Sequence, residues 1–176
     1  MKTVKILIVA VVIGFLGYMA YAINLKYSEG KELRNRISTL PPFRFERIGE
    51  GFFTEDDLDA NTPLILFYFN SSCTFCRSEA NEIRNKLGRF SGFQLVFVST
   101  EDKILIKKFS EEFGLNGKGN DIFLRDSDLE FSRIFGVITV PATYIYNTER
   151  QLIKEFKGAV KIASLLEAIQ EKPEAY

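Results

Sequence analysis

Apolar residues follow three kinds of pattern along the chain. An uninterrupted stretch without charge covers residues 6–23. Two short runs, residues 64–69 and 95–98, are apolar at consecutive positions, which is typical of strands buried on both faces of a parallel sheet. After each run, apolar residues recur at helical spacing. The alternation predicts a globular α/β domain behind an apolar N-terminal segment.

The N-terminal stretch has the length of a membrane anchor. As a helix, residues 6–23 would span roughly 27 Å, about the thickness of the hydrocarbon layer. Lys2 and Lys5 precede it and would stay in the cytoplasm. We expect residues 1–23 to form an uncleaved anchor; a cleaved signal peptide is the alternative, because residues 20–22 read Ala-Tyr-Ala. Either way, the following domain would lie on the extracytoplasmic side, where disulfides persist.

Residues 24–42 are polar and charged and end at Pro41-Pro42. This composition predicts a stalk, or a helix that continues from the anchor, and the prolines would end it. The globular domain is expected at residues 43–176. It should begin with a half-buried strand at Phe43 and Phe45 that turns at residues 49–51 and pairs back through residues 52–53. A capped helical turn should follow.

The rest of the domain predicts the order β-α-β-(α-β-α)-β-β-α, with parallel strands first and an antiparallel hairpin last. The residues that carry these elements are the helix face Cys76, Ala80, Ile83, Leu87 and Phe90; the helix face Leu105, Phe109 and Phe113; the strand 121–124; the helix 129–135, stopped by Gly136; the strands 142–146 and 151–156; and the helix face Ile162, Leu165, Leu166 and Ile169.

The two cysteines of the chain stand together as Cys73-Thr74-Phe75-Cys76, between the first buried strand and a helix. The first thiol would lie at a helix N-terminus, where free N–H groups and the helix dipole favour a thiolate. The second would lie one turn further on, close enough to form a disulfide. A chance pair of buried cysteines is the alternative, but the position favours reversible dithiol/disulfide chemistry.

The amino-acid composition argues against several other functions. The chain has 176 residues, with 23 basic and 23 acidic side chains, and this balance does not indicate a nucleic-acid partner. There is no histidine, the commonest general base and metal ligand. Two thiols cannot complete a zinc site, which needs four ligands. We therefore expect neither a metal nor another cofactor.

The order of elements, with CxxC opening the helix after the first central strand, resembles the thioredoxin fold over roughly residues 43–172. A second mark is the segment from Gly136 to Tyr144, which contains Val140-Pro141. The resemblance implies a mixed central sheet flanked by helices, and a cis Val140–Pro141 bond beside the cysteines. Without the resemblance, a trans proline opening a strand would be the ordinary reading.

Within that fold, the chain is most similar to membrane-anchored thiol–disulfide oxidoreductases of the TlpA/ResA type. The apolar N-terminus, the sequence Cys76-Arg77-Ser78-Glu79 and the room for a central insertion between Phe97 and Pro141 carry this likeness. Two departures are Ser72, in place of a frequent tryptophan, and Thr74-Phe75, in place of a frequent x-Pro pair. Because the intervening dipeptide tunes the reduction potential, no potential can be inferred.

The resemblance implies roles for the site residues. Cys73 would attack a substrate disulfide and Cys76 would resolve the mixed disulfide, while Glu79 would take part in proton transfer; a solvated helix glutamate is the alternative for Glu79. The acid that thioredoxin buries before its cysteines is absent, since Phe67 occupies that position.

Substrate binding would fall to the backbone beside Val140 and Pro141, together with Thr74 and Phe75. The expected partners are protein disulfides or dithiols, and a membrane or exported thiol donor as reductant.

Three other functions remain as alternatives. A peroxiredoxin-like thiol peroxidase would need Pro at position 66 and Thr or Ser at position 70, where Leu66 and Asn70 stand. A copper-delivery protein of the Sco type needs a CxxxC pair and a distal histidine, and the chain has neither. A non-enzymatic binding module would use a structural disulfide, yet the small CxxC ring adds little loop-closure stability. Substrate, reductant and direction of exchange are left open.

Overall fold

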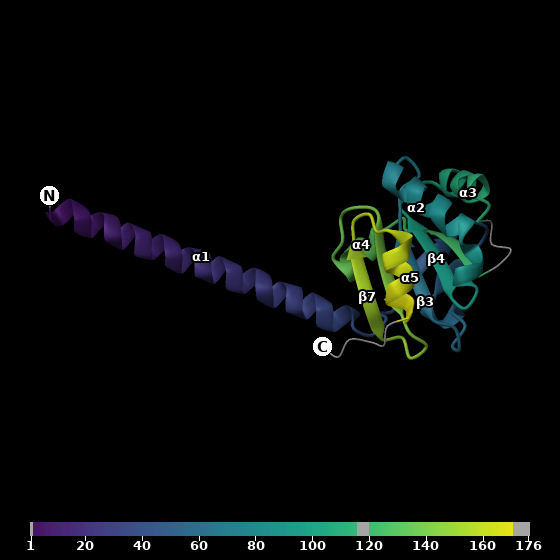
Figure 1. The fold of residues 1–176 in the computed structure, drawn as a ribbon, viewed down its shortest axis with the longest axis horizontal. Helices are drawn as coiled ribbons and strands as arrows, with labels where there is room; N and C mark the ends of the chain where they lie inside the picture. The colour runs from purple at the N-terminus through teal and green to yellow at the C-terminus, as the bar shows by residue number, and fades with distance from the viewer. Residues whose placement is uncertain (1, 116–119, 171–176) are drawn as a thin grey trace. The chain divides into compact units, whose positions relative to one another are not determined.

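The computed structural model of the protein describes residues 2–115 and 120–170, and only the backbone for residues 2–10 and 170. The chain divides into two compact units, Met1–Arg36 and Ile37–Tyr176. Figure 1 shows the first unit as a single long helix and the second as a sheet flanked by helices. The end of the predicted thioredoxin-like region, up to Lys172, lies outside the described residues.

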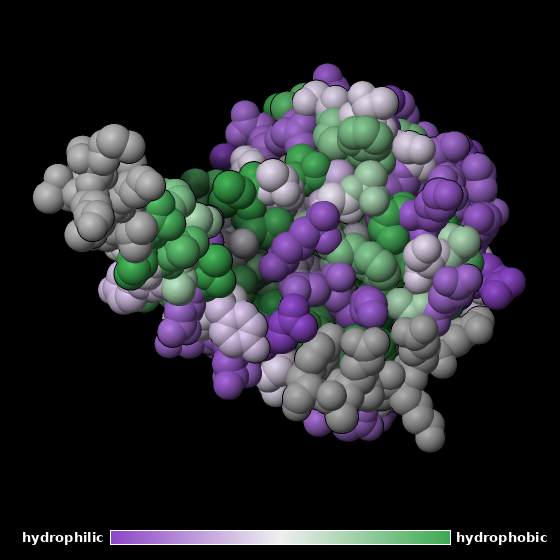
Figure 2. All heavy atoms as spheres, turned by 60° about the vertical axis from the view of Figure 1, so that its left-hand side comes forward, coloured by the Kyte–Doolittle hydropathy of each residue, from purple (hydrophilic) through white to green (hydrophobic). Residues whose placement is uncertain are grey.

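Helix α1, Lys2–Ile37, runs without a break through the apolar stretch and most of the polar segment behind it. Most of its described apolar side chains, such as Ile13 and Phe15, are exposed, whereas Ile37 at its end is buried. Figure 2 shows hydrophobic residues gathered at the left of the view. Within residues 11–115 and 120–169, no helix combines the length and apolar character needed to cross a membrane. The helix ends at Ile37, ahead of the two prolines, where the Tyr146 hydroxyl donates to the Ile37 carbonyl at 3.0 Å.

The globular unit is built on a seven-stranded mixed sheet in the order β2-β1-β5-β4-β3-β6-β7. The parallel centre comprises β3 (Leu64–Tyr68), β4 (Gln94–Ser99) and β5 (Asp121–Arg125). Strands β6 (Ala142–Tyr146) and β7 (Leu152–Lys157) add to it antiparallel. The predicted thioredoxin-like α/β architecture is thus confirmed for the described part of the chain.

The predicted N-terminal hairpin forms the other edge of the sheet. Strands β1 (Arg44–Arg47) and β2 (Phe52–Thr54) are antiparallel, with Phe45 opposite Phe53. The 3₁₀ turn η1 (Glu55–Asp57) follows with the expected capping box. Strand β1 also pairs antiparallel with β5, so the hairpin extends the sheet.

Helices cover both faces of the sheet. Side chains of α2 (Thr74–Asn85), α3 (Lys103–Glu112) and α5 (Ile162–Gln170) belong to one apolar cluster with β3, β4 and β5. Helix α4 (Glu130–Phe135) packs on the opposite face, where Phe131 stacks on Tyr68 with ring centroids 4.5 Å apart. In Figure 1, α2 and α5 lie in front of the strands.

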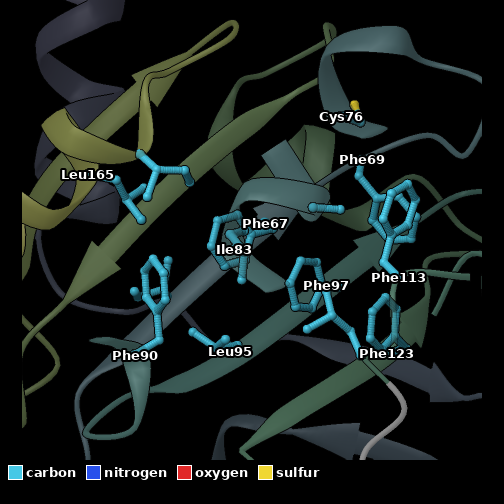
Figure 3. Packing of buried hydrophobic residues seen from close by; sticks show 14 of the residues in the cluster. Phe67, Phe69, Cys76, Ile83, Phe90, Leu95, Phe97, Phe113, Phe123 and Leu165 are labelled. Atoms are coloured by element: carbon cyan, nitrogen blue, oxygen red, sulfur yellow. The ribbon is translucent and has the colours of Figure 1, made fainter. Parts of the chain in front are cut away.

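A ladder of phenylalanines forms the centre of the larger cluster (Figure 3). The parallel register places Phe67 beside Phe97 and Phe97 beside Phe123. Their ring centroids lie 4.7 Å and 4.6 Å apart in turn. Because these three rings come from three strands, the ladder ties the centre of the sheet together.

Two predicted helix faces differ in detail from the structure. Helix α2 ends at Asn85, and Leu87 lies exposed in the following 3₁₀ turn, η2 (Leu87–Phe90). In α3, Leu105 is 44% exposed, and Ile106 is the residue that packs inward with Phe109. Leu105 and Ile106 both lie at helical spacing from Phe109, and Leu87 lies at helical spacing from Ile83. The spacing alone therefore shows neither which residue packs inward nor where the helix ends.

Candidate active site

The cysteine pair lies at the junction of β3 and α2. Cys73 caps the helix: its Sγ accepts a hydrogen bond from the Cys76 backbone N–H at 3.3 Å. Cys73 is half-buried, whereas Cys76 is only 3% exposed. Both are free thiols. One sulfur can therefore meet a substrate, and the other lies beneath it.

The environment of Cys76 disfavours its ionisation. Burial raises the pKa of the Cys76 thiol far above its ordinary value, and a hydrogen bond with the Cys73 side chain adds to this. The backbone N–H of Asn70 acts in the opposite direction, because it donates to the sulfur and stabilises the thiolate. Cys76 thus needs a proton acceptor when it reacts.

Glu79 lies one turn after Cys76 and is 7% exposed. Burial raises the pKa of its carboxyl to about 7, although the Thr143 hydroxyl, which donates to Oε1 at 3.4 Å, works to lower it. A cavity of about 10 Å³ is lined by Cys76, Glu79 and Pro141, among others; this is about the volume that one water molecule needs. The carboxyl of Glu79 can therefore exchange a proton near neutral pH.

The Val140–Pro141 bond is cis, as the resemblance implied. The Val140 carbonyl oxygen lies 4.0 Å from the Cys73 sulfur. Since the Pro141 carbonyl accepts the Gly158 N–H at 2.9 Å, the segment is fixed to the sheet on one side and meets the reactive thiol on the other.

The remaining predicted residues, Thr74 and Phe75, form the exposed start of α2. Phe75 is 64% exposed. Ile138, two residues before Val140, is 92% exposed, and the sequence analysis did not include it. Ile138 stands among the apolar residues Val137 and Val140, whose pattern does not show which side chain is exposed, so only the position of the loop beside Cys73 draws attention to it.

Glu101, which was not predicted as a site residue, holds the loop before Cys73 through Ser71. Both carboxylate oxygens of Glu101 accept hydrogen bonds from Ser71, one from the backbone N–H at 2.6 Å and the other from Oγ at 2.7 Å. Glu101 follows β4, and the carboxyl ends of parallel strands meet at one edge of a sheet. The sequence could have indicated this role, because Glu101 stands two residues after the end of β4.

The described side chains supply thiols, a buried carboxyl and backbone groups for chemistry. Within residues 11–115 and 120–169, no cluster of three or more cysteine, aspartate or glutamate side chains could hold a metal ion. The arrangement can perform thiol–disulfide exchange: an accessible sulfur, a second sulfur one turn away, and a buried acid beside it.

Comparison with known proteins places the fold in a family. Residues 38–155 match the model of the AhpC/TSA family. No curated protein sequence matches the chain.

Similar solved structures share the fold at low sequence identity. A secreted Mycobacterium tuberculosis disulfide oxidoreductase homologous to E. coli DsbE has TM-score 0.62 and 19% identity, and the match covers 77% of this chain and 96% of that one. StoA from Bacillus subtilis has TM-score 0.58 and 17% identity, covering 76% and 99%. The peroxidoxin BcpB from Mycobacterium tuberculosis has TM-score 0.64 and 18% identity, covering 75% and 94%.

Proposed function

The chain belongs to the AhpC/TSA family, and from this premise we propose that it is a thiol–disulfide oxidoreductase that exchanges disulfides with proteins through Cys73 and Cys76. The observation that carries the proposal is the unequal pair of thiols. Cys73 is half-buried at the cap of α2, and Cys76 lies buried one turn away with its N–H on the Cys73 sulfur. A structural pair would not require one accessible sulfur.

The exchange proceeds in two steps that conserve electrons. The Cys73 thiolate attacks one sulfur of a substrate disulfide; a Cys73–substrate disulfide forms, and the other substrate sulfur leaves as a thiolate. The Cys76 thiolate then attacks the Cys73 sulfur, so the Cys73–Cys76 disulfide forms and the second substrate sulfur is released. The substrate disulfide gains two electrons, which the two cysteines lose. A thiol donor in the same compartment, on the membrane or exported, returns the protein to the dithiol form.

Glu79 is the proton acceptor in the second step. Its carboxyl lines the same small cavity as Cys76, and its pKa of about 7 lets it take a proton at neutral pH. The burial that raises the pKa of Cys76 makes such an acceptor necessary.

Substrate would bind across the Val140–Pro141 segment. An extended substrate segment could pair with backbone groups there, a form of strand addition. Thr74 and Phe75 follow the reactive Cys73 in sequence, and Ile138 lies two residues before Val140, whose carbonyl is near the Cys73 sulfur. These exposed side chains offer apolar and polar contacts to the residues around a substrate disulfide.

We further propose that residues 1–23 tether the domain to the cytoplasmic membrane, on its outer side. The support is the uncharged sequence of residues 6–23 behind Lys2 and Lys5. When cells that express the full chain are fractionated, the protein should be found in the membrane fraction, and an alkaline wash should not release it. A mature protein that begins near residue 23 would contradict the anchor and favour a cleaved signal peptide.

The central test is reduction of insulin by the full chain with dithiothreitol as electron donor. Wild-type protein should accelerate precipitation of the insulin chains, and Cys73→Ser should abolish the acceleration. Cys76→Ser should instead accumulate mixed disulfides with insulin that a reductant dissolves. Equal activity of wild type and Cys73→Ser would refute the proposed function.

A second candidate is a thiol peroxidase, favoured by the family and by the likeness in fold to the peroxidoxin BcpB. Leu66, buried in β3, and Asn70 stand where the peroxidatic motif needs proline and a hydroxyl residue. With dithiothreitol as electron donor, the rates of hydrogen peroxide consumption and of insulin reduction can be compared. A faster rate with hydrogen peroxide would support this candidate over the first.

A further inference from the structure

Ser71, two residues before Cys73, is held on both sides by charged side chains. The Glu101 carboxylate accepts its N–H at 2.6 Å and its hydroxyl at 2.7 Å. On the other side, the Arg77 guanidinium donates to the Ser71 carbonyl at 3.3 Å. All the polar groups of this one residue are thus bonded to ionised side chains from two other segments of the chain.

Each of the two charged groups is itself fixed. The Ser99 hydroxyl, at the end of β4, donates to the Glu101 carboxylate at 3.2 Å. The Arg77 guanidinium forms an ion pair with Glu112 of α3 and lies 5.2 Å from the centre of the Phe113 ring. The loop before Cys73 is therefore bonded to the ends of β4 and α3 as well as to its own helix.

Asn70, the residue before Ser71, links the loop to the cysteine pair. The Asn70 carbonyl accepts the Cys73 backbone N–H at 3.1 Å, and the Cys73 sulfur accepts the Cys76 N–H at 3.3 Å. The Asn70 side chain accepts from Ser72 N–H at 2.9 Å. A rotation of the peptide before Ser71 would turn the Asn70 carbonyl and weaken these contacts.

We propose that Glu101 is a positioning residue for disulfide exchange: by fixing the Ser71 N–H it orients the Asn70 carbonyl that accepts the Cys73 N–H, and so holds the Cys73 sulfur within reach of Cys76 for the second, resolving step. The inference rests on the proposed function of the cysteine pair. No part of the Glu101 side chain needs to touch substrate, since it acts through Ser71 and Asn70.

A carboxylate suits this position because it only accepts hydrogen bonds, and three donors converge on it: Ser71 N–H, Ser71 Oγ and Ser99 Oγ. Glutamine has the same shape but offers one oxygen, and its amide N–H₂ would face a donor. Glu101→Gln therefore removes at least one charge-assisted bond while it preserves volume.

The experiment follows the reaction of the reduced full chain with 5,5′-dithiobis(2-nitrobenzoate) by stopped flow. The first equivalent of released chromophore reports attack by Cys73, and the second reports resolution by Cys76. Glu101→Gln should slow the second phase by about tenfold, a typical consequence of losing one such bond, and change the first phase by less than about twofold. Ser71→Ala, which removes one donor, should give a smaller effect in the same direction.

Glu111→Gln is the matched control, because the Glu111 side chain is exposed on α3, where it pairs with Lys107; it should match wild type in both phases. If Glu101→Gln resolves at the wild-type rate, or slows both phases equally, the inference is wrong while the proposed function stands. If wild type itself releases no second equivalent, the proposed function fails instead. Should Glu101→Gln unfold, an unchanged second phase in Ser71→Ala would overturn the inference.

Discussion

Cys73 and Cys76 are separated by one helical turn, yet their surroundings differ. Cys73 is half-buried and receives an N–H at the start of α2. Cys76 is enclosed by apolar side chains of α2 and β3, and burial raises the pKa of its thiol. Burial also limits the access of reagents to Cys76. The raised pKa and the limited access both make Cys76 less reactive than Cys73.

Single-cysteine variants should show this difference directly. Cys76→Ser, which retains Cys73, should react with iodoacetamide at pH 7.5 at least about tenfold faster than Cys73→Ser, because thiolate is the nucleophile. Alkylation is followed by mass. Equal rates across the pH range would contradict the assignment of Cys73 as the attacking thiol.

Glu79 should make stability depend on pH. Its pKa is about 7 in the folded protein, above the ordinary value of 4.5, mainly because of burial. A raised pKa means that the folded state binds the proton more tightly than the unfolded state. The contribution to stability is therefore complete below about pH 4.5 and is lost as pH rises through about 7.

Glu79→Gln cannot ionise and should not lose this contribution. The free energy of unfolding of Glu79→Gln minus that of wild type should therefore be about 3 kcal/mol larger at pH 8 than at pH 4.5. Urea denaturation of the reduced proteins at both pH values measures the difference. Glu111→Gln, at an exposed position on α3, is the control. Parallel stability curves for wild type and Glu79→Gln would show that Glu79 does not titrate in this range.

At the scale of elements, helix α4 connects the core to the Val140–Pro141 segment. The buried side chain of Asp126 accepts the backbone N–H groups of Glu130 and Phe131, at 2.8 Å and 2.9 Å, where the helix begins. Gly136 ends the helix with a φ of 60°, a conformation that glycine adopts without strain. The helix is short, so these end contacts account for much of its stability.

Asp126→Ala should therefore lower the free energy of unfolding by about 2 kcal/mol, since it leaves the half-buried N–H of Glu130 and the buried N–H of Phe131 without their acceptor. Asp128→Ala, at an exposed position in the same turn, should change it by less than about 0.5 kcal/mol. Urea denaturation compares the two. A loss at Asp126 no larger than at Asp128 would mean that the cap does not stabilise α4.

Much of this arrangement was predictable because it depends on local signals. The consecutive apolar runs identified β3 and β4, Gly136 identified the end of α4, and the alternation at Phe45 identified the hairpin. The cis bond at Pro141 was predictable only through the resemblance to thioredoxin, since no local pattern of this chain specifies it.

The parts that could not be predicted depend on contacts between distant segments. Neither pairing of β1 with β5 nor the bonding of Glu101 to Ser71 leaves a periodic signal, because each joins residues brought together by the sheet. The burial of Ile106 instead of Leu105 depends on the direction in which α3 crosses the sheet. For the same reason the sequence identified the cysteines but not the residues that hold their loop.

At the scale of the whole molecule, the core and the candidate site use aromatic residues differently. Phe97 is buried between Phe67 and Phe123, whereas Phe75 is largely exposed beside the reactive sulfur. Phe97→Ala should lower the free energy of unfolding by about 3–5 kcal/mol through the cavity it leaves. Phe75→Ala should change it by less than about 0.5 kcal/mol.

Phe75→Ala also tests whether Phe75 contributes to substrate binding and not to stability. Phe75→Ala should reduce the rate of insulin reduction by roughly threefold or more, from the lost apolar contact, and leave the reaction with a small disulfide reagent unchanged. Equal effects on both substrates would remove Phe75 from the substrate-binding surface.

The most direct test of the account is a redox titration of the full chain in mixtures of reduced and oxidised dithiothreitol. Free thiols are trapped with a maleimide, and the two forms are counted by mass. We predict a single transition with a two-electron slope, in which Cys73 and Cys76 are lost together as one intramolecular disulfide and regained on reduction. Thiols that stay free in fully oxidising mixtures, or that are lost only through disulfides between chains, would contradict the account.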